Sequence, residues 1–274
     1  MKCTEEKMEE IKNDNRYRDI GVLPSQFIPY KSAHLDKLGE PYAKVPRMEQ
    51  MFIRPFEIAD FKLLSQAVEL KRHAYLVRAI NNVISYPAEW LTVGDFYYVL
   101  AWLRIYSMPK RPYTFEWKCE MPYYRHKETR VPLNYAQETW PSTEELTENY
   151  EVSSCNTDNI SVTEWSDLQT KVLAEDLELP EGFDFPRVNT FDDANNSQND
   201  PELAQLVPSV QWIAGVTWAE KLQKANEDFD AFQTGLDLND VIDHGIVENV
   251  AFSCRQCRVR HIQPLTLNAF SFFR

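Results

Sequence analysis

The chain has 274 residues, of which 43% are hydrophobic and 13% aromatic, and its formal net charge is −13. This length and composition suit a folded protein with a sizeable core, built as one large domain or two smaller ones, and the negative charge disfavours extensive binding to nucleic acid. No apolar run approaches the roughly 20 residues of a membrane span, and the charged N-terminus has no signal-peptide stretch, so we expect synthesis in the cytoplasm and no membrane contact.

The first hundred residues predict a charged arm followed by helices. Residues 1–20 are rich in charge, and several prolines favour extended backbone in the segment after them. From about Asp60 to Ser85, apolar residues recur at helical spacing. Thr92 can cap a further helix, because its hydroxyl can accept a backbone N–H of the first turn, and this helix is expected to end near Ser107.

A hairpin is predicted after these helices. Residues 113–119 alternate in the period-2 manner of a half-buried strand, and residues 130–135 are its expected hairpin partner. Together the helices and the hairpin form a predicted core domain over residues 21–137.

A strongly acidic segment follows the core domain. Residues 138–202 contain 17 Asp and Glu residues against only Lys171 and Arg187, a local charge of −15, so the rest of the chain is close to neutral. Within this segment a helix-like pattern over residues 161–177 leads into a loop rich in Asn and Asp. We predict a solvated, adaptable insertion over residues 138–208, with contact to a basic partner as the second interpretation.

The C-terminal segment 209–274 is predicted to pack on the core domain. A long amphipathic helix is expected over Ser209–Thr234, and a short helix over Leu236–His244. Strand-like sequences, the last of them over residues 265–273, flank a pair of cysteines and indicate a Cys-bearing hairpin. The predicted fold class is therefore α+β, with central amphipathic helices flanked by β-hairpins.

The sharpest chemical signal is the pair Cys254 and Cys257, with His261 four residues further along the chain. A two-residue gap lets two thiolates face one ion across a tight turn, as in zinc knuckles. A closed structural zinc site needs four ligands, so one more must come from elsewhere. The alternative is that these cysteines serve as small buried apolar residues.

The fourth ligand could be Cys119, His126 or Cys155. We favour Cys119, because the sequences after Cys119 and Cys254 are similar and each runs through an Arg-His pair to a Pro-Leu pair. The predicted site is therefore a structural zinc ion bound by Cys119, Cys254, Cys257 and His261.

Catalytic and nucleotide-binding motifs are absent from the sequence. It has no P-loop, no dinucleotide-binding glycine motif, no HExxH and no nucleophile elbow, so we expect no enzymatic activity. Basic turns at Arg125–Lys127 and Arg255–His261 leave open a zinc-ribbon regulator that binds nucleic acid. Solvated hairpin surfaces, or docking to an acidic surface of a partner, are the simpler interpretation.

Several short motifs occur in an order that is typical of one protein family. They are Leu23-Pro-Ser25 with Pro29-Tyr30, the run Phe52–Phe56 at the start of a helix, the run Leu91–Arg104 (LTVGDFYYVLAWLR) and the strand into Cys119. In this order they resemble a family of T-even-type phage baseplate hub proteins over residues 22–135, with a looser similarity over 250–274. In the family the strand commonly leads into a CxxC turn, and this chain departs from that pattern because Pro122 replaces the second Cys.

The resemblance implies a structural component of the baseplate of a contractile phage tail, in or next to the hub, that packs against other subunits without catalysis. Its expected location is the virion, and its expected partners are hub, tube or tape-measure proteins of the tail. The family also includes helpers of hub assembly, so the alternative is a transient assembly chaperone that is absent from the mature virion.

Overall fold

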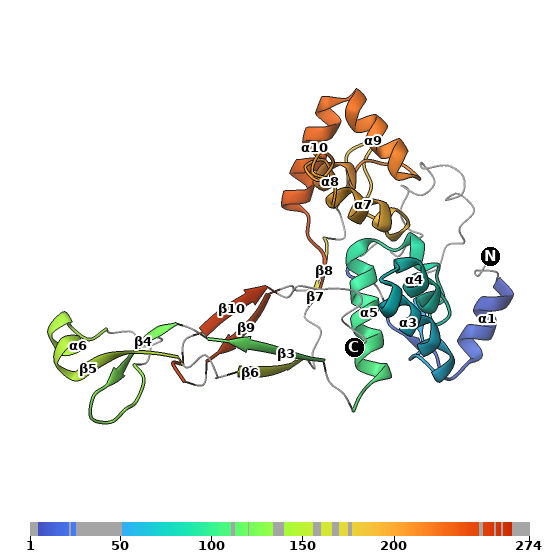
Figure 1. Ribbon diagram of the computed structural model, residues 1–274. Helices are drawn as coiled ribbons and strands as arrows, with labels where there is room; N and C mark the ends of the chain where they lie inside the picture. The colour runs from blue at the N-terminus through green and yellow to red at the C-terminus, as the bar shows by residue number, and fades with distance from the viewer. Residues whose placement is uncertain are drawn as a thin grey trace. The chain divides into compact units, whose positions relative to one another are not determined.

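The computed structural model describes residues 5–21, 23–25, 51–110, 113–119, 121–133, 140–155, 160–165, 170–174, 177–246, 249–254, 256–258 and 260–264. These residues form helices and small antiparallel two-stranded sheets (Figure 1), which confirms the α+β prediction. The strand expected over residues 265–273 and most of the extended segment after residue 25 lie outside the described residues. No helix in the described ranges is long and apolar enough to cross a membrane.

The chain divides into two compact units. Unit 1 combines residues 1–109 with residues 168–247, and unit 2 combines residues 110–167 with residues 248–266. The acidic segment 138–202 is therefore shared between the two units rather than forming a separate body.

Unit 1 is mainly helical, and its described residues include two short pairs of strands, β1 with β2 and β7 with β8. Its elements are α1 (Glu5–Asn13), β1 (Arg18–Asp19), β2 (Phe52–Ile53), α3 (Ile58–Leu70), α4 (His73–Asn81), η2 (Ala88–Trp90), α5 (Val93–Ser107), β7 (Thr170–Lys171), η3 (Val188–Thr190), α7 (Phe191–Gln198), α8 (Val207–Val210), α9 (Trp218–Glu227), α10 (Phe229–Val241) and β8 (Gly245–Ile246).

The N-terminal part of unit 1 is held together by the apolar residues that the helical spacing indicated. Leu64 and Ile80, on α3 and α4, are almost completely buried, as is Phe96 on α5. The single helix expected over residues 60–85 is instead two helices, because Lys71 adopts the left-handed conformation (φ 50°) that ends α3. The predicted cap of α5 is present, since Thr92 Oγ1 accepts a hydrogen bond from the N–H of Asp95 over 3.1 Å.

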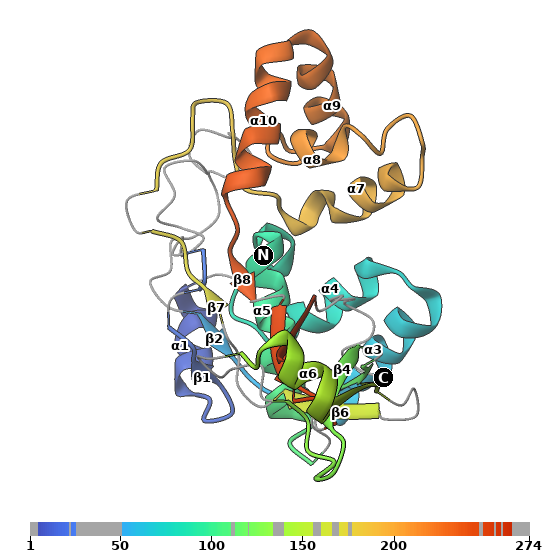
Figure 2. The ribbon, with the colours of Figure 1, turned by 90° about the vertical axis from the view of Figure 1, so that its left-hand side faces the viewer.

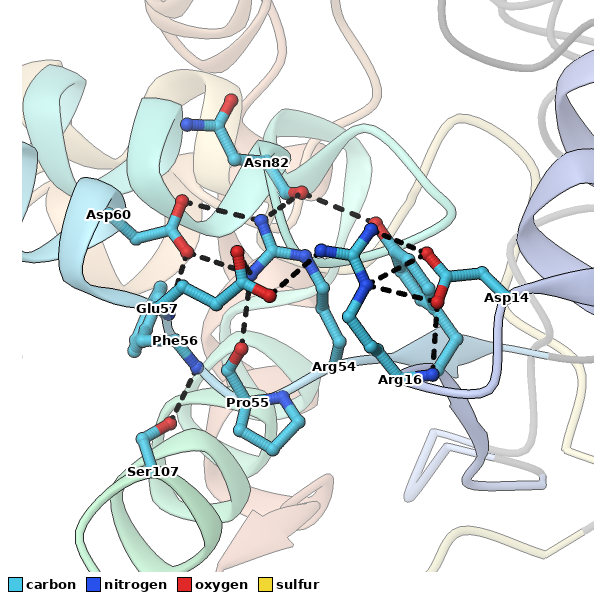
Figure 3. A network of polar contacts seen from close by, with 10 residues as sticks. Asp14, Arg16, Arg54, Pro55, Phe56, Glu57, Asp60, Asn82 and Ser107 are labelled. Carbon is cyan, nitrogen blue, oxygen red and sulfur yellow. Dashed lines mark hydrogen bonds and ion pairs between the residues drawn. The ribbon is translucent and has the colours of Figure 1, made fainter.

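Ion pairs tie the N-terminal arm to α3 (Figure 3). Arg16 contacts Asp14 in its own turn and also Glu57 at the start of α3, over 2.7 and 2.8 Å. Next to Arg16, the buried Arg54 binds Asp60 over 2.8 Å. The arm is therefore attached to the helical core by polar contacts, and the charge that marked it in the sequence serves this attachment.

A second apolar cluster joins the α8, α9 and α10 helices, which lie together in both ribbon views (Figures 1 and 2). The long helix predicted over Ser209–Thr234 is wrong, because the chain forms these three shorter helices instead. The breaks follow from capping residues: Thr217 accepts the N–H of Glu220 to begin α9, and Asp228 accepts two N–H groups to begin α10.

In the part of unit 2 that the structure describes, the chain forms three antiparallel strand pairs and one short helix. Its elements are β3 (Tyr113–Lys118), β4 (Pro122–His126), α6 (Thr143–Asn149), β5 (Tyr150–Ser154), β6 (Ile160–Trp165), β9 (Asn249–Ser253) and β10 (Arg260–Pro264). The pairs are β3 with β6, β4 with β5, and β9 with β10. The last pair is the predicted Cys-bearing hairpin.

Two sequence-based predictions within unit 2 are wrong. The partner of β3 is β6, with Lys118 opposite Ile160, rather than residues 130–135. The region expected to begin a helix at residue 161 is therefore a strand, which agrees with its β-branched residues. Residues 131–133 lie instead beside β4, where the Leu133 N–H donates to the carbonyl of Tyr124 over 2.8 Å.

Candidate metal centre

Four cysteines from three separate parts of unit 2 meet at the ends of its strands. Cys119 follows β3, Cys155 follows β5, and Cys254 and Cys257 lie in the turn between β9 and β10. All four side chains are buried, and their Sγ atoms lie within 4.8 Å of one another. The cluster therefore joins all three strand pairs of the unit.

Cys119 and Cys155 meet because a long two-stranded ribbon is interrupted. β3 leads into β4 and β5 leads into β6, and both strand pairs are antiparallel. Three residues separate β3 from β4, whereas five separate β5 from β6, so the register shifts by two between the pairs Pro122–Ser154 and Lys118–Ile160. The two cysteines lie at this irregularity, where the pairing changes register, and the N–H of Cys155 still donates to the carbonyl of Met121.

The turn between β9 and β10 has the geometry of a metal-binding knuckle. The N–H of Arg258 donates to the carbonyl of Cys254 over 2.8 Å, and Arg258 itself has a positive φ of 58°. The N–H of Gln256 points at Cys254 Sγ from 3.4 Å. Backbone N–H groups aimed at a sulfur favour its thiolate form, which is the form that binds metals.

Two of the sulfur–sulfur distances match those expected around a tetrahedral ion. Four thiolates at a zinc–sulfur distance of about 2.3 Å stand about 3.8 Å apart at the corners of a tetrahedron. Cys119 Sγ lies 3.8 Å from Cys257 Sγ, and Cys155 Sγ lies 3.8 Å from Cys254 Sγ. Soft thiolate ligands in this geometry select zinc or iron rather than magnesium or calcium.

The protein shifts the pKa values of two of these thiols in opposite directions. Burial, together with hydrogen bonds from the neighbouring thiols, raises the pKa of Cys155 above its usual range. Burial acts in the same direction on Cys254, but backbone N–H groups of Cys257 and Gln256 outweigh it and lower the pKa of that thiol. A bound cation would favour the thiolate at each position, because coordination releases the proton.

The structure brings together three of the predicted ligands, Cys119, Cys254 and Cys257, with Cys155 in the fourth place. Cys155 is one of the alternative ligands named from the sequence. Its neighbour Ser154 pairs with Pro122, the residue that replaces the second Cys after Cys119, so Cys155 lies next to the place where that second Cys would stand. His261 lies on β10 opposite Phe252, and its side chain is outside the described residues.

His126, the other alternative ligand, takes part in different contacts. Its Nδ1 accepts the N–H groups of Glu128 and Thr129 over 3.2 and 3.3 Å, within a tight turn. Its ring lies edge-on to Tyr150 with centroids 5.3 Å apart. His126 therefore stabilises the end of the β4–β5 ribbon and is not a member of the cysteine cluster.

Unit 1 contains a buried polar group of a different kind, around the start of α5. Asp95 accepts hydrogen bonds from the N–H and the hydroxyl of Ser25 over 2.9 and 2.6 Å. Thr92 Oγ1 lies 2.8 Å from Nε2 of His244. Burial raises the pKa of Asp95 and lowers that of His244. These side chains satisfy one another, so the network ties the segment before β8 to α5.

Comparison with known proteins adds no relative: no protein-family model, no curated protein and no solved structure matches the chain.

Proposed function

We propose that the chain is a structural zinc protein that acts by packing against other subunits of a contractile phage tail baseplate. The observation that carries the structural role is the closed set of four buried thiols. Zinc bound by four protein ligands has no coordination position left for a substrate or a catalytic water. An ion in this site would hold the three strand pairs of unit 2 together.

Exposed apolar side chains on unit 2 support a role in packing. Met121, Trp140 and Val152 are 48, 53 and 67% exposed. Large apolar side chains at the surface are suited to the centre of an interface, where burial against a partner removes them from water. The proposed assignment to the baseplate rests on the resemblance of residues 22–135 to the hub family.

The proposed location of the protein in the tail baseplate is tested by mass spectrometry of purified tail particles of the phage that encodes this chain. We expect the chain to be present at a fixed ratio to the other tail proteins. Its absence from particles, with its presence in infected cells bound to a hub or tape-measure protein, would support a transient assembly chaperone instead. Absence from both samples would refute any role in the tail.

The metal is tested by elemental analysis of the purified chain. We expect one zinc ion per chain that remains bound through gel filtration. A metal-free chain with all four thiols reduced and unit 2 folded would contradict the structural zinc site, whatever the particles contain.

A further inference from the structure

The β4–β5 ribbon has one covered edge and one open edge. Residues 131–133 lie along the outer edge of β4, where the His126 N–H donates to Val131 and the Leu133 N–H donates to Tyr124. No residue in the described ranges pairs with the outer edge of β5. Proteins usually protect such an edge with proline, lysine or a bulge, and the β5 sequence YEVSS has none of these.

The backbone groups that point outward from β5 can be assigned from its register. The Cys155 N–H donates to Met121 and the Lys127 N–H donates to Asn149, so the odd-numbered positions of β5 face β4. The even-numbered residues therefore direct their backbone groups outward. The N–H of Tyr150 is used to cap α6, which leaves the N–H groups of Val152 and Ser154 and the carbonyls of Tyr150, Val152 and Ser154.

This set of outward groups is self-complementary. When two copies of β5 run antiparallel about Val152, each Val152 exchanges N–H···O bonds with its equivalent, and each Ser154 N–H meets the carbonyl of Tyr150 in the other copy. Four of the six possible hydrogen bonds can form. The two N–H groups that cannot contribute are those of Tyr150, and both are already satisfied within their own chains.

The side chains and charges suit the same register. The only charged residue of β5 is Glu151, which is paired with Arg125 over 2.7 Å and also with Arg130. In the self-paired register Glu151 faces Ser153 of the other copy, so no like charges are directly opposite. The two Glu151 side chains are diagonal neighbours, and each is neutralised by Arg125 and Arg130 of its own chain. On the other face Val152, which is 67% exposed and lies opposite Tyr124, would pack against the second Val152.

We propose that β5 is a self-association edge, which joins two copies of this chain through a continuous four-stranded sheet in the order β4, β5, β5, β4. The proposal does not rest on the baseplate role, and it requires only that unit 2 is folded. A five-residue strand pair buries much less than the roughly 1,600 Å² of a standard interface. We therefore expect a dissociation constant on the order of 100 µM, so that pairing depends on a high local concentration of the chain.

Sedimentation velocity across a concentration series up to several times this value tests the proposal with two matched variants. Val152→Lys places a charge at the centre of the open edge. Val131→Lys places the same charge at another exposed valine (47% exposed) beside the covered edge. The average mass of the wild type and of Val131→Lys should rise above the 32.1 kDa of one chain, whereas Val152→Lys should remain at one chain.

Hydrogen exchange provides the second measurement. In the wild type the amides of Val152 and Ser154 should exchange more slowly as the concentration rises, while those in the covered segment 131–133 should not change. A wild type that stays at one chain throughout the series would overturn the proposal. Association that Val152→Lys leaves intact, with the zinc content and circular dichroism of that variant unchanged, would overturn it equally.

Discussion

The amine of Lys221 shows how strongly burial acts on a single side chain of unit 1. The residue is 3% exposed, and Nζ donates to the carbonyl of Gln211 over 2.9 Å. Burial lowers the pKa of Lys221 from 10.5 to about 8, and the nearby charge of Asp184 only partly opposes it. The folded protein therefore contains a poorly solvated cation at neutral pH.

Replacing this amine should change the dependence of stability on pH. Because the folded pKa lies below the unfolded one, the folded state binds fewer protons between pH 8 and 10.5, so the free energy of unfolding rises with pH across that window. The gain from this one group approaches about 3 kcal/mol as an upper bound. Lys221→Met should remove that rise, as measured by urea unfolding at several pH values. The exposed Lys224→Met is the matched control, and an equal pH slope in both variants would contradict the prediction.

The ligand set can be decided by two further substitutions. Cys155→Ser should lower the affinity for zinc by more than about 100-fold, because it removes one of four buried thiolates that lie within 4.8 Å of one another. His261→Ala should leave the affinity unchanged, since the four cysteines already complete a tetrahedral site. Competition with a chromophoric chelator measures both. If His261→Ala lost zinc and Cys155→Ser kept it, the result would support the ligand set predicted from the sequence instead.

Sequence spacing identified part of this site for a physical reason. Cys254 and Cys257 are close in the chain, so a tight turn alone brings them together, and the CxxC pattern reports that turn. Cys119 and Cys155 are 36 residues apart, and they meet only because β3 pairs with β6 and β4 with β5. Pairing between strands that are this far apart in the sequence depends on the whole fold rather than on local preference. The sequence therefore allowed Cys155 as a ligand but gave no reason to prefer it over Cys119 or His126.

At the scale of elements, the same distinction accounts for some of the outcomes, and competing local signals account for others. The start of α5 is set locally by Thr92, and it was predicted correctly. The breaks at Thr217 and Asp228 are also local, but apolar periodicity runs through them and hid the caps. The partner of β3 lies more than 40 residues away along the chain, so a search for a hairpin partner close in the sequence could not find it.

The break between α3 and α4 gives a test at this scale. Lys71 ends α3 with φ 50° and ψ 41°, a conformation that costs any residue with a Cβ more than it costs glycine. Lys71→Gly should therefore raise the free energy of unfolding by about 0.5 to 1 kcal/mol. Lys62→Gly, at an exposed position inside α3, should lower it by about 1 kcal/mol. Thermal or urea unfolding measures both, and destabilisation by Lys71→Gly would contradict the assignment of a left-handed helix end.

At the scale of the whole molecule, the two units differ in what stabilises them. Unit 1 has buried apolar residues in its helices, including Leu76 and Leu100, and in the segments between them, including Phe185 and Trp212. Among the side chains described in unit 2, the buried apolar ones are the four cysteines with Tyr123 and Leu133. Isolated two-stranded ribbons are marginal in water, so the stability of unit 2 should depend mainly on the cysteine cluster.

Removal of the metal should therefore unfold unit 2 and leave unit 1 folded. Structural zinc contributes roughly 10 to 16 kcal/mol in small zinc-dependent domains, which is as large as the whole net stability of a typical domain, about 5 to 15 kcal/mol. After treatment with a strong chelator, amide protection should be lost over residues 113–165 and 249–264 and kept in α3–α5 and α8–α10, as measured by hydrogen exchange. Returning zinc should restore it. If protection in both regions survived chelation, the ribbons would have a source of stability other than the metal, and if both regions lost it together, the two units would fold as one.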